Sequence, residues 1–131
     1  MNPVTQTLLD QVADPDIIAL VEHWDVIEDV VIRVYRSRAV SRKDEQDFIA
    51  TKRWLARNHM RWSAALEPYW RRAEIKGLGL ATDDPFQRLL AFDQARDFVG
   101  NWNAMQLLPA VRQAINEWLL DMISEANSPA Y

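Results

Sequence analysis

Apolar residues recur every three or four positions through most of the chain, which is the spacing of one face of an α-helix. The clearest run predicts a helix over about residues 15–38. Charged residues fill the positions between, so this helix should bury one side against the rest of the protein. Its apolar positions are Ile17, Leu20, Val21, Trp24, Ile27, Val31, Val34 and Tyr35.

The same periodicity predicts three more main helices, over about 42–66, 85–106 and 109–126, with short helices near 4–12 and 69–76. The helix over 85–106 is expected to turn one apolar face to the core. That face consists of Ala91, Phe92, Ala95, Phe98, Val99, Trp102 and Met105.

Prolines mark where these helices should begin or break. Asp14-Pro15 and Asp84-Pro85 each place an N-cap acceptor before a proline, which fits the first position of a helix. Pro68 has no amide hydrogen, so the helix over 42–66 is expected to kink or restart there. Pro109 is expected to lie in the first turn of the last helix.

The fold class that follows is all-α: one compact bundle of about four main helices, spanning residues 1–131, with a frayed tail from about 127. The 131 residues match a common domain size, and three glycines are too few for the turns of a β-rich domain. Cysteine is absent, which excludes disulfides and thiolate chemistry. No signal-peptide pattern or long apolar stretch is present, so we expect a cytoplasmic protein without a membrane partner.

Charge is unevenly distributed along the sequence. Residues 1–40 carry a net charge of −4, residues 41–77 carry +4, and residues 78–131 carry −4. The basic middle also holds tryptophans, and we define residues 52–76 as the basic aromatic segment. Such a segment can pack internally, can anchor a protein interface, since Trp, Tyr and Arg dominate binding hot spots, or can contact nucleic acid. Its candidate contact residues are Trp54, Arg57, Arg61, Trp70, Arg71 and Arg72.

Residues that could carry catalysis are few. His23 and His59 each fall on or beside an apolar stripe and are interpreted as core histidines, since no spacing typical of metal ligands surrounds them. Arg53 and His59 loosely match the arginine–histidine pattern of small helical ribonucleases, although six positions separate the two side chains by about 120° around a helix. No cofactor or metal is expected.

The leading hypothesis is therefore a non-enzymatic helical protein-interaction module, either a homo-oligomer or a small subunit of a larger assembly. The alternative is a small helical subunit that contacts nucleic acid within a ribonucleoprotein or effector complex through residues 52–76. A small all-α ribonuclease that uses Arg53 and His59 is the third hypothesis.

Overall fold

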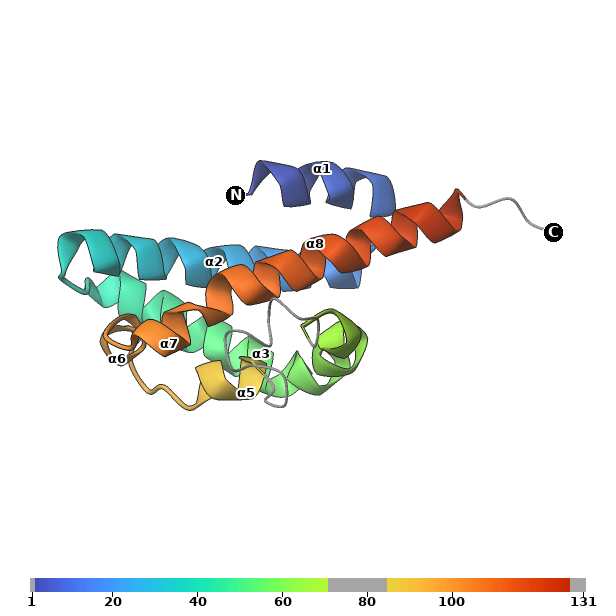
Figure 1. The fold of residues 1–131 in the computed structure, drawn as a ribbon. Coiled ribbons are helices and arrows are strands. Elements are labelled where there is room, and N and C mark those ends of the chain that lie inside the picture. Colours follow the sequence, from blue (N-terminus) through green and yellow to red (C-terminus); the bar gives the residue numbers. More distant parts are fainter. Residues whose placement is uncertain (1, 71–84, 128–131) are drawn as a thin grey trace.

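The computed structural model describes residues 2–70 and 85–127, and every regular element within them is a helix, without any strand. This confirms the predicted all-α class. Two long antiparallel helices, α2 and α3, form a hairpin that α8 crosses, and short helices cover the side of α3 (Figure 1). The helices are α1 (Pro3–Val12), α2 (Pro15–Ser37), α3 (Arg42–Trp70), α5 (Pro85–Leu90), α6 (Ala95–Val99), α7 (Trp102–Met105) and α8 (Leu107–Ala126).

Capping residues determine the ends of α2, as the sequence predicts. The Asp14 side chain accepts hydrogen bonds from the amides of Asp16 and Ile17, and Pro15 takes the first helical position. At the other end Arg38 adopts the left-handed conformation, with φ of 56°, and its amide donates to the carbonyl of Val34. This turn lets the chain reverse into α3 after only a few residues.

The start and end of α3 differ in how well the sequence predicts them. Ser41 caps its first turn, with the Ser41 Oγ accepting from the Asp44 amide at 3.0 Å. The helix then continues through Pro68 to at least Trp70 rather than ending near residue 66. Leu66 and Trp70 are both buried on either side of the proline. Their packing therefore outweighs the one hydrogen bond that the proline removes.

The predicted helix over 85–106 is wrong: the structure has the three short helices α5, α6 and α7 there. Gln94 is extended, with φ of −130°, and α6 begins after it. Asn101 is also extended, and its side chain accepts from the amide of Ala104 at 3.0 Å, which starts α7. These two breaks change the direction of the chain. Phe98 is therefore buried, whereas Trp102, which was expected on the same buried face, is 71% exposed.

Aromatic rings from α2, α3, α5 and α6 fill the core. Phe86 of α5 meets Trp24 and Trp70 edge-on, with ring centroids 5.8 and 6.0 Å apart. Phe98 of α6 packs near Phe48, with the two ring planes tilted by 48°. These contacts hold the short helices against α2 and α3, although each short helix has too few residues to be stable alone. In the described residues no helix is long and apolar enough to cross a membrane.

A buried ion-pair network joins α1, α2 and α8. Arg112 of α8 lies between the carboxylates of Asp25 and Glu28, with its Nε 3.3 Å from Glu28 Oε2. Its Nη1 donates to Thr5 Oγ1 at 3.1 Å, and that hydroxyl donates to Asn116 at 2.6 Å. Burial alone lowers the pKa of Arg112, but the bonds and charges of Glu28 and Asp25 outweigh it and leave the pKa raised.

Candidate functional site

Trp54, the first of the six candidate contact residues, has an intramolecular partner. Its ring stacks on that of His23, with centroids 4.0 Å apart and planes 10° from parallel. His23 Nδ1 lies 2.7 Å from the carbonyl oxygen of Ala19, so this nitrogen carries the hydrogen and donates. Both rings are half-buried. The stack joins α2 to α3 and explains why a tryptophan stands on the polar side of α3.

The arginines on the same side of α3 differ in their surroundings. Arg61 pairs with Asp16 at the start of α2 and lies over the ring of Trp62, 4.9 Å from its centroid. Arg57 is exposed, and its guanidinium has no bonded partner among residues 2–70 and 85–127. A role of Arg57 in binding a partner stays a prediction.

Of the remaining members of the predicted set, the structure describes only Trp70, and it does not form a surface with Arg57. Trp70 is only 3% exposed, in edge-on contact with Phe86, so its side chain is not accessible to a partner. Arg71 and Arg72 lie outside the described residues. Within its described part, residues 52–70, the basic aromatic segment is therefore divided between internal packing and solvent and does not form one face.

The ribonuclease pair also stays apart in the described structure. Arg53 is exposed on α3, whereas the half-buried His59 lies further along the helix with its Nδ1 3.3 Å from the carbonyl of Ala56. Neither side chain bonds the other in the described part of the chain. No group of three or more described His, Asp or Glu residues is arranged to hold a metal ion.

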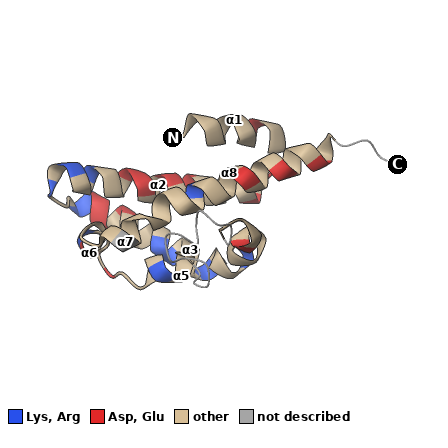
Figure 2. Cartoon of the chain, viewed as in Figure 1, with Lys and Arg blue, Asp and Glu red and all other residues tan. Residues whose placement is uncertain are grey.

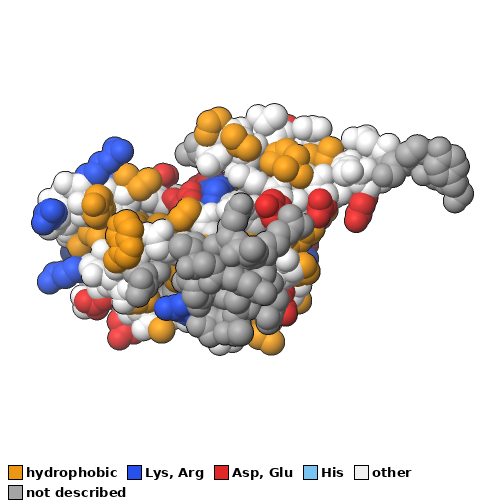
Figure 3. All heavy atoms as spheres, viewed as in Figure 1, with side chains coloured by type: hydrophobic (Ala, Val, Ile, Leu, Met, Phe, Trp, Pro, Cys, Tyr) orange, Lys and Arg blue, Asp and Glu red, His pale blue; other side chains and the backbone are white. Residues whose placement is uncertain are grey.

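A different surface stands out, at the end of the bundle where α2 finishes beside α6 and α7. Ile32, Tyr35 and Trp102 are large, exposed apolar residues that line one hollow of about 400 Å³. Its remaining apolar lining comes from α2, α7 and the start of α8: Val31, Met105, Leu108 and Pro109. Apolar and basic side chains lie side by side at this end of the molecule (Figure 3).

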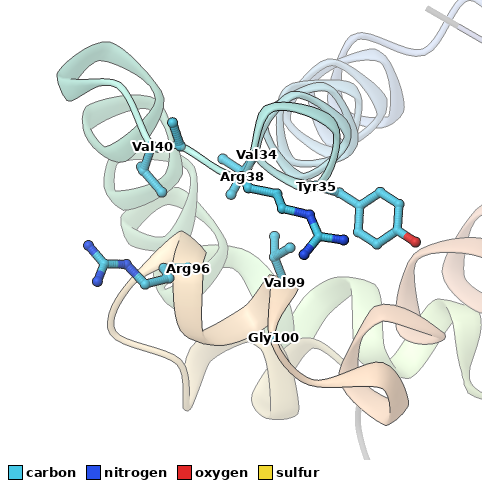
Figure 4. A pocket seen from close by; sticks show the side chains of 8 residues that line it. Val34, Tyr35, Arg38, Val40, Arg96, Val99 and Gly100 are labelled. Carbon is cyan, nitrogen blue, oxygen red and sulfur yellow. The ribbon is translucent and has the colours of Figure 1, made fainter.

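A second hollow, of about 480 Å³, adjoins the first one and shares Tyr35 with it. The Arg38 side chain extends between Tyr35 and Val99, and Arg96 projects from α6 on the other side (Figure 4). Val34 and Val40 complete the apolar lining. The hollow thus combines an apolar floor with guanidinium groups at its rim.

A third hollow, on the far side of the α2–α3 turn, shows how charge is balanced here. Asp44, its only acidic lining residue, is bonded by Arg33, with the Nη2 group 2.8 Å and Nε 3.0 Å from Oδ1. The hydrogen bond from Arg33 is the largest cause that holds the pKa of Asp44 below its ordinary value. Arg36, Arg38 and Arg96 have no bonded carboxylate in the described residues, so positive charge prevails at this end (Figure 2).

We call this region the α2-end surface and define it by Ile32, Tyr35, Arg36, Arg38, Arg96 and Trp102. The sequence pattern places Tyr35 and Trp102 in apolar stripes that are expected to be buried, and it indicates none of the three arginines as a contact residue. One sequence feature could have indicated that Trp102 is exposed. Gly100-Asn101 is a helix stop followed by an N-cap, and it interrupts the apolar stripe before Trp102.

No protein-family model, curated protein or solved structure matches this chain significantly. The functional argument therefore depends on the residues and geometry of the chain itself.

Proposed function

We propose that the protein is a non-enzymatic protein-interaction module that binds its partner through the α2-end surface. The observation that carries this proposal is the exposure of Trp102 beside an apolar hollow whose rim holds Tyr35 and Arg36. An exposed tryptophan costs solvation free energy in the isolated protein, and a partner that covers it recovers that free energy.

The composition of the surface supports this function. Interface hot spots are enriched in Trp, Tyr and Arg, and are grouped where a pocket can exclude water. All three residue types are present within the two adjacent hollows. The local excess of arginine also favours an acidic partner and sets its orientation. This positive patch contrasts with the chain as a whole, which has a net charge of −4.

Affinity capture from extracts of the source cells tests the proposal with a matched pair of variants. Trp102→Ser should lose the proteins that the unmodified chain retains, including any copies of the chain itself. Met60→Ser is the control, because Met60 is also 71% exposed but lies on α3 and lines none of the three hollows. Equal retention by both variants would refute the proposal.

The alternative function, contact with nucleic acid, is favoured by one feature of the same surface. Exposed aromatic rings beside arginines can stack on bases while the arginines bind phosphates. Binding of single-stranded RNA or DNA should then weaken steeply with salt and depend on Trp102. An absence of binding at low salt would exclude this alternative.

A further inference from the structure

We infer that the α2-end surface recognises a short acidic segment of its partner, in which carboxylates stand beside a large apolar side chain. The carboxylates bind at the hollow that Arg38 and Arg96 line, and the apolar side chain enters the adjoining hollow beside Trp102. This inference rests on the proposed function, since it names the chemistry of the partner at that same surface.

The charge of the two hollows carries the first step. Arg38 and Arg96 line one hollow and Arg36 lines the other, and no acidic residue of the described chain lines either of them. Asp97 follows Arg96 on α6, but successive side chains on a helix point about 100° apart, and Asp97 lines neither hollow. Guanidinium groups without a counter-charge favour an anionic occupant, and they bond carboxylates through paired hydrogen bonds.

The third hollow shows an arginine of the same helix whose charge the fold does balance. Arg33 lies one turn before Arg36 on α2, and its Nε and Nη2 lie 3.0 and 2.8 Å from Oδ1 of Asp44. The described part of the chain supplies no such carboxylate to Arg36 or Arg38. A partner carboxylate at Arg38 would form the kind of pair that Asp44 forms with Arg33.

The position of Arg38 brings the charged group next to apolar surface. Its side chain extends between Tyr35 and Val99 (Figure 4). A carboxylate bonded there would lie beside apolar groups that exclude part of the water, which strengthens a charged hydrogen bond. Tyr35 lines both hollows, so a segment bound at Arg38 reaches the second hollow by passing over Tyr35.

The second hollow supplies a place for the apolar side chain. Trp102 is 71% exposed at this hollow and Ile32 is 46% exposed, so both have apolar area that an occupant can cover. Met105 also lines the hollow, and its flexible side chain can adapt to the group that binds. The volume of about 400 Å³ has room for a large aliphatic or aromatic side chain. Recognition of acidic motifs by clustered arginines is an established mode of peptide binding.

The shape of the surface favours a peptide over an anionic lipid bilayer, which also attracts exposed tryptophan and arginine side chains. A bilayer is broad and takes up side chains that project from a protein. Here Tyr35 and Trp102 border hollows, and the two hollows adjoin at Tyr35. A narrow peptide chain can fill both hollows, whereas a flat surface would leave them empty.

Selection from a library of random short peptides displayed on phage, against the immobilised full chain, tests the inference directly. The library is first depleted on Trp102→Ser, so that peptides bound elsewhere on the molecule are removed. The peptides that remain should be enriched in Asp and Glu close to Leu or Phe. They should bind Arg38→Glu at least about tenfold more weakly, because that change places like charges opposite one another.

The tightest of these peptides, labelled with fluorescein, then separates the two contacts by fluorescence anisotropy. Amides in place of its acids should weaken binding to the unmodified chain about tenfold or more, but should have a much smaller effect on binding to Arg38→Met. Alanine in place of its apolar residue should show the same dependence on Trp102. Arg57→Met is the control, because Arg57 is exposed on α3 and lines none of the hollows, and it should bind each peptide as the unmodified chain does. Circular dichroism should show that all variants remain helical.

Three results would overturn the inference. They are an absence of retained peptides, a retained set without enrichment in acids, and an amide effect equal in Arg38→Met and the unmodified chain. If no acidic peptide is retained while vesicles of phosphatidylserine and phosphatidylcholine bind in a Trp102-dependent way, the surface faces a membrane instead. Trp102-dependent capture of a protein without any acidic peptide would leave the proposed function standing, and failure of that capture would refute the function itself, so the two failures are distinguishable.

Discussion

Replacing Arg112 with leucine should destabilise the fold more than any surface substitution. The change removes a cation that is 7% exposed and leaves the carboxylates of Asp25 and Glu28, 16% and 19% exposed, facing each other without a counter-charge. It also removes the donor that binds Thr5 Oγ1, whose own bond to Asn116 ties α1 to α8.

The magnitude follows from the burial of the partners. Removal of one member of a buried ion pair costs about 3–5 kcal/mol, mainly because the remaining charge is left unpaired. The two carboxylates keep some contact with water, so we expect a value near the lower limit, about 3 kcal/mol. That is a large part of the roughly 5–15 kcal/mol by which a domain of ordinary stability is folded.

Urea denaturation followed by circular dichroism measures this loss as a shift in the midpoint at constant slope. Arg57→Leu is the matched control, since an exposed arginine without a bonded partner should change stability by no more than about 0.5 kcal/mol. Adding Asp25→Asn and Glu28→Gln to Arg112→Leu should recover part of the loss by removing the unpaired charges. A cost below about 1 kcal/mol for Arg112→Leu would refute this account of the network.

Two further predictions concern positions at the ends of helices. Arg38→Gly should stabilise the fold by about 1 kcal/mol in thermal or chemical denaturation, because glycine adopts the left-handed conformation without strain, yet should weaken retention of the partner proteins in affinity capture. Ala13→Gly, at the equivalent position after α1 with φ of 54°, should stabilise similarly and leave that retention unchanged; equal retention by the two variants would exclude Arg38 from the proposed contact. For Asp44, whose pKa is held below its ordinary 3.8, the carboxylate should stabilise the fold above pH 3.8 and lose this effect as the pH falls below that value. The stability difference between the unmodified chain and Asp44→Asn should therefore be constant from neutral pH to about pH 5 and shrink below about pH 4; a difference that stays constant at low pH would contradict this.

The parts of the fold that the sequence predicts well are those where one signal is local and complete. The helix α2 has an N-cap followed by proline, an uninterrupted apolar stripe and a basic last turn, and all of them lie within the helix itself. The segment 85–106 misleads because apolar residues in three short helices fall at spacings close to those of one long helix. The exact residue at which each short helix ends decides whether Trp102 is buried or exposed. That position depends on contacts with α2 and α3.

The contact residues were harder to predict because their partners are distant in sequence. Trp54 needs His23, and nothing within α3 indicates which α2 ring lies opposite it. Asp25 and Glu28 lie three apart on α2, and their counter-charge comes from 84 or more residues away. A single sequence contains these residues but not the packing that pairs them.

Net charge counted along the sequence also fails to locate the positive surface, for a physical reason. The basic middle, residues 41–77, loses part of its positive character in the fold, since Arg61 pairs with Asp16 of the acidic first segment. Arg36 and Arg38 belong to that acidic segment, yet its carboxylates lie further back along α2 and leave the last turn uncompensated. The ion pairs that the helices form therefore determine which arginines remain exposed, and these are the arginines that the proposed partner would contact.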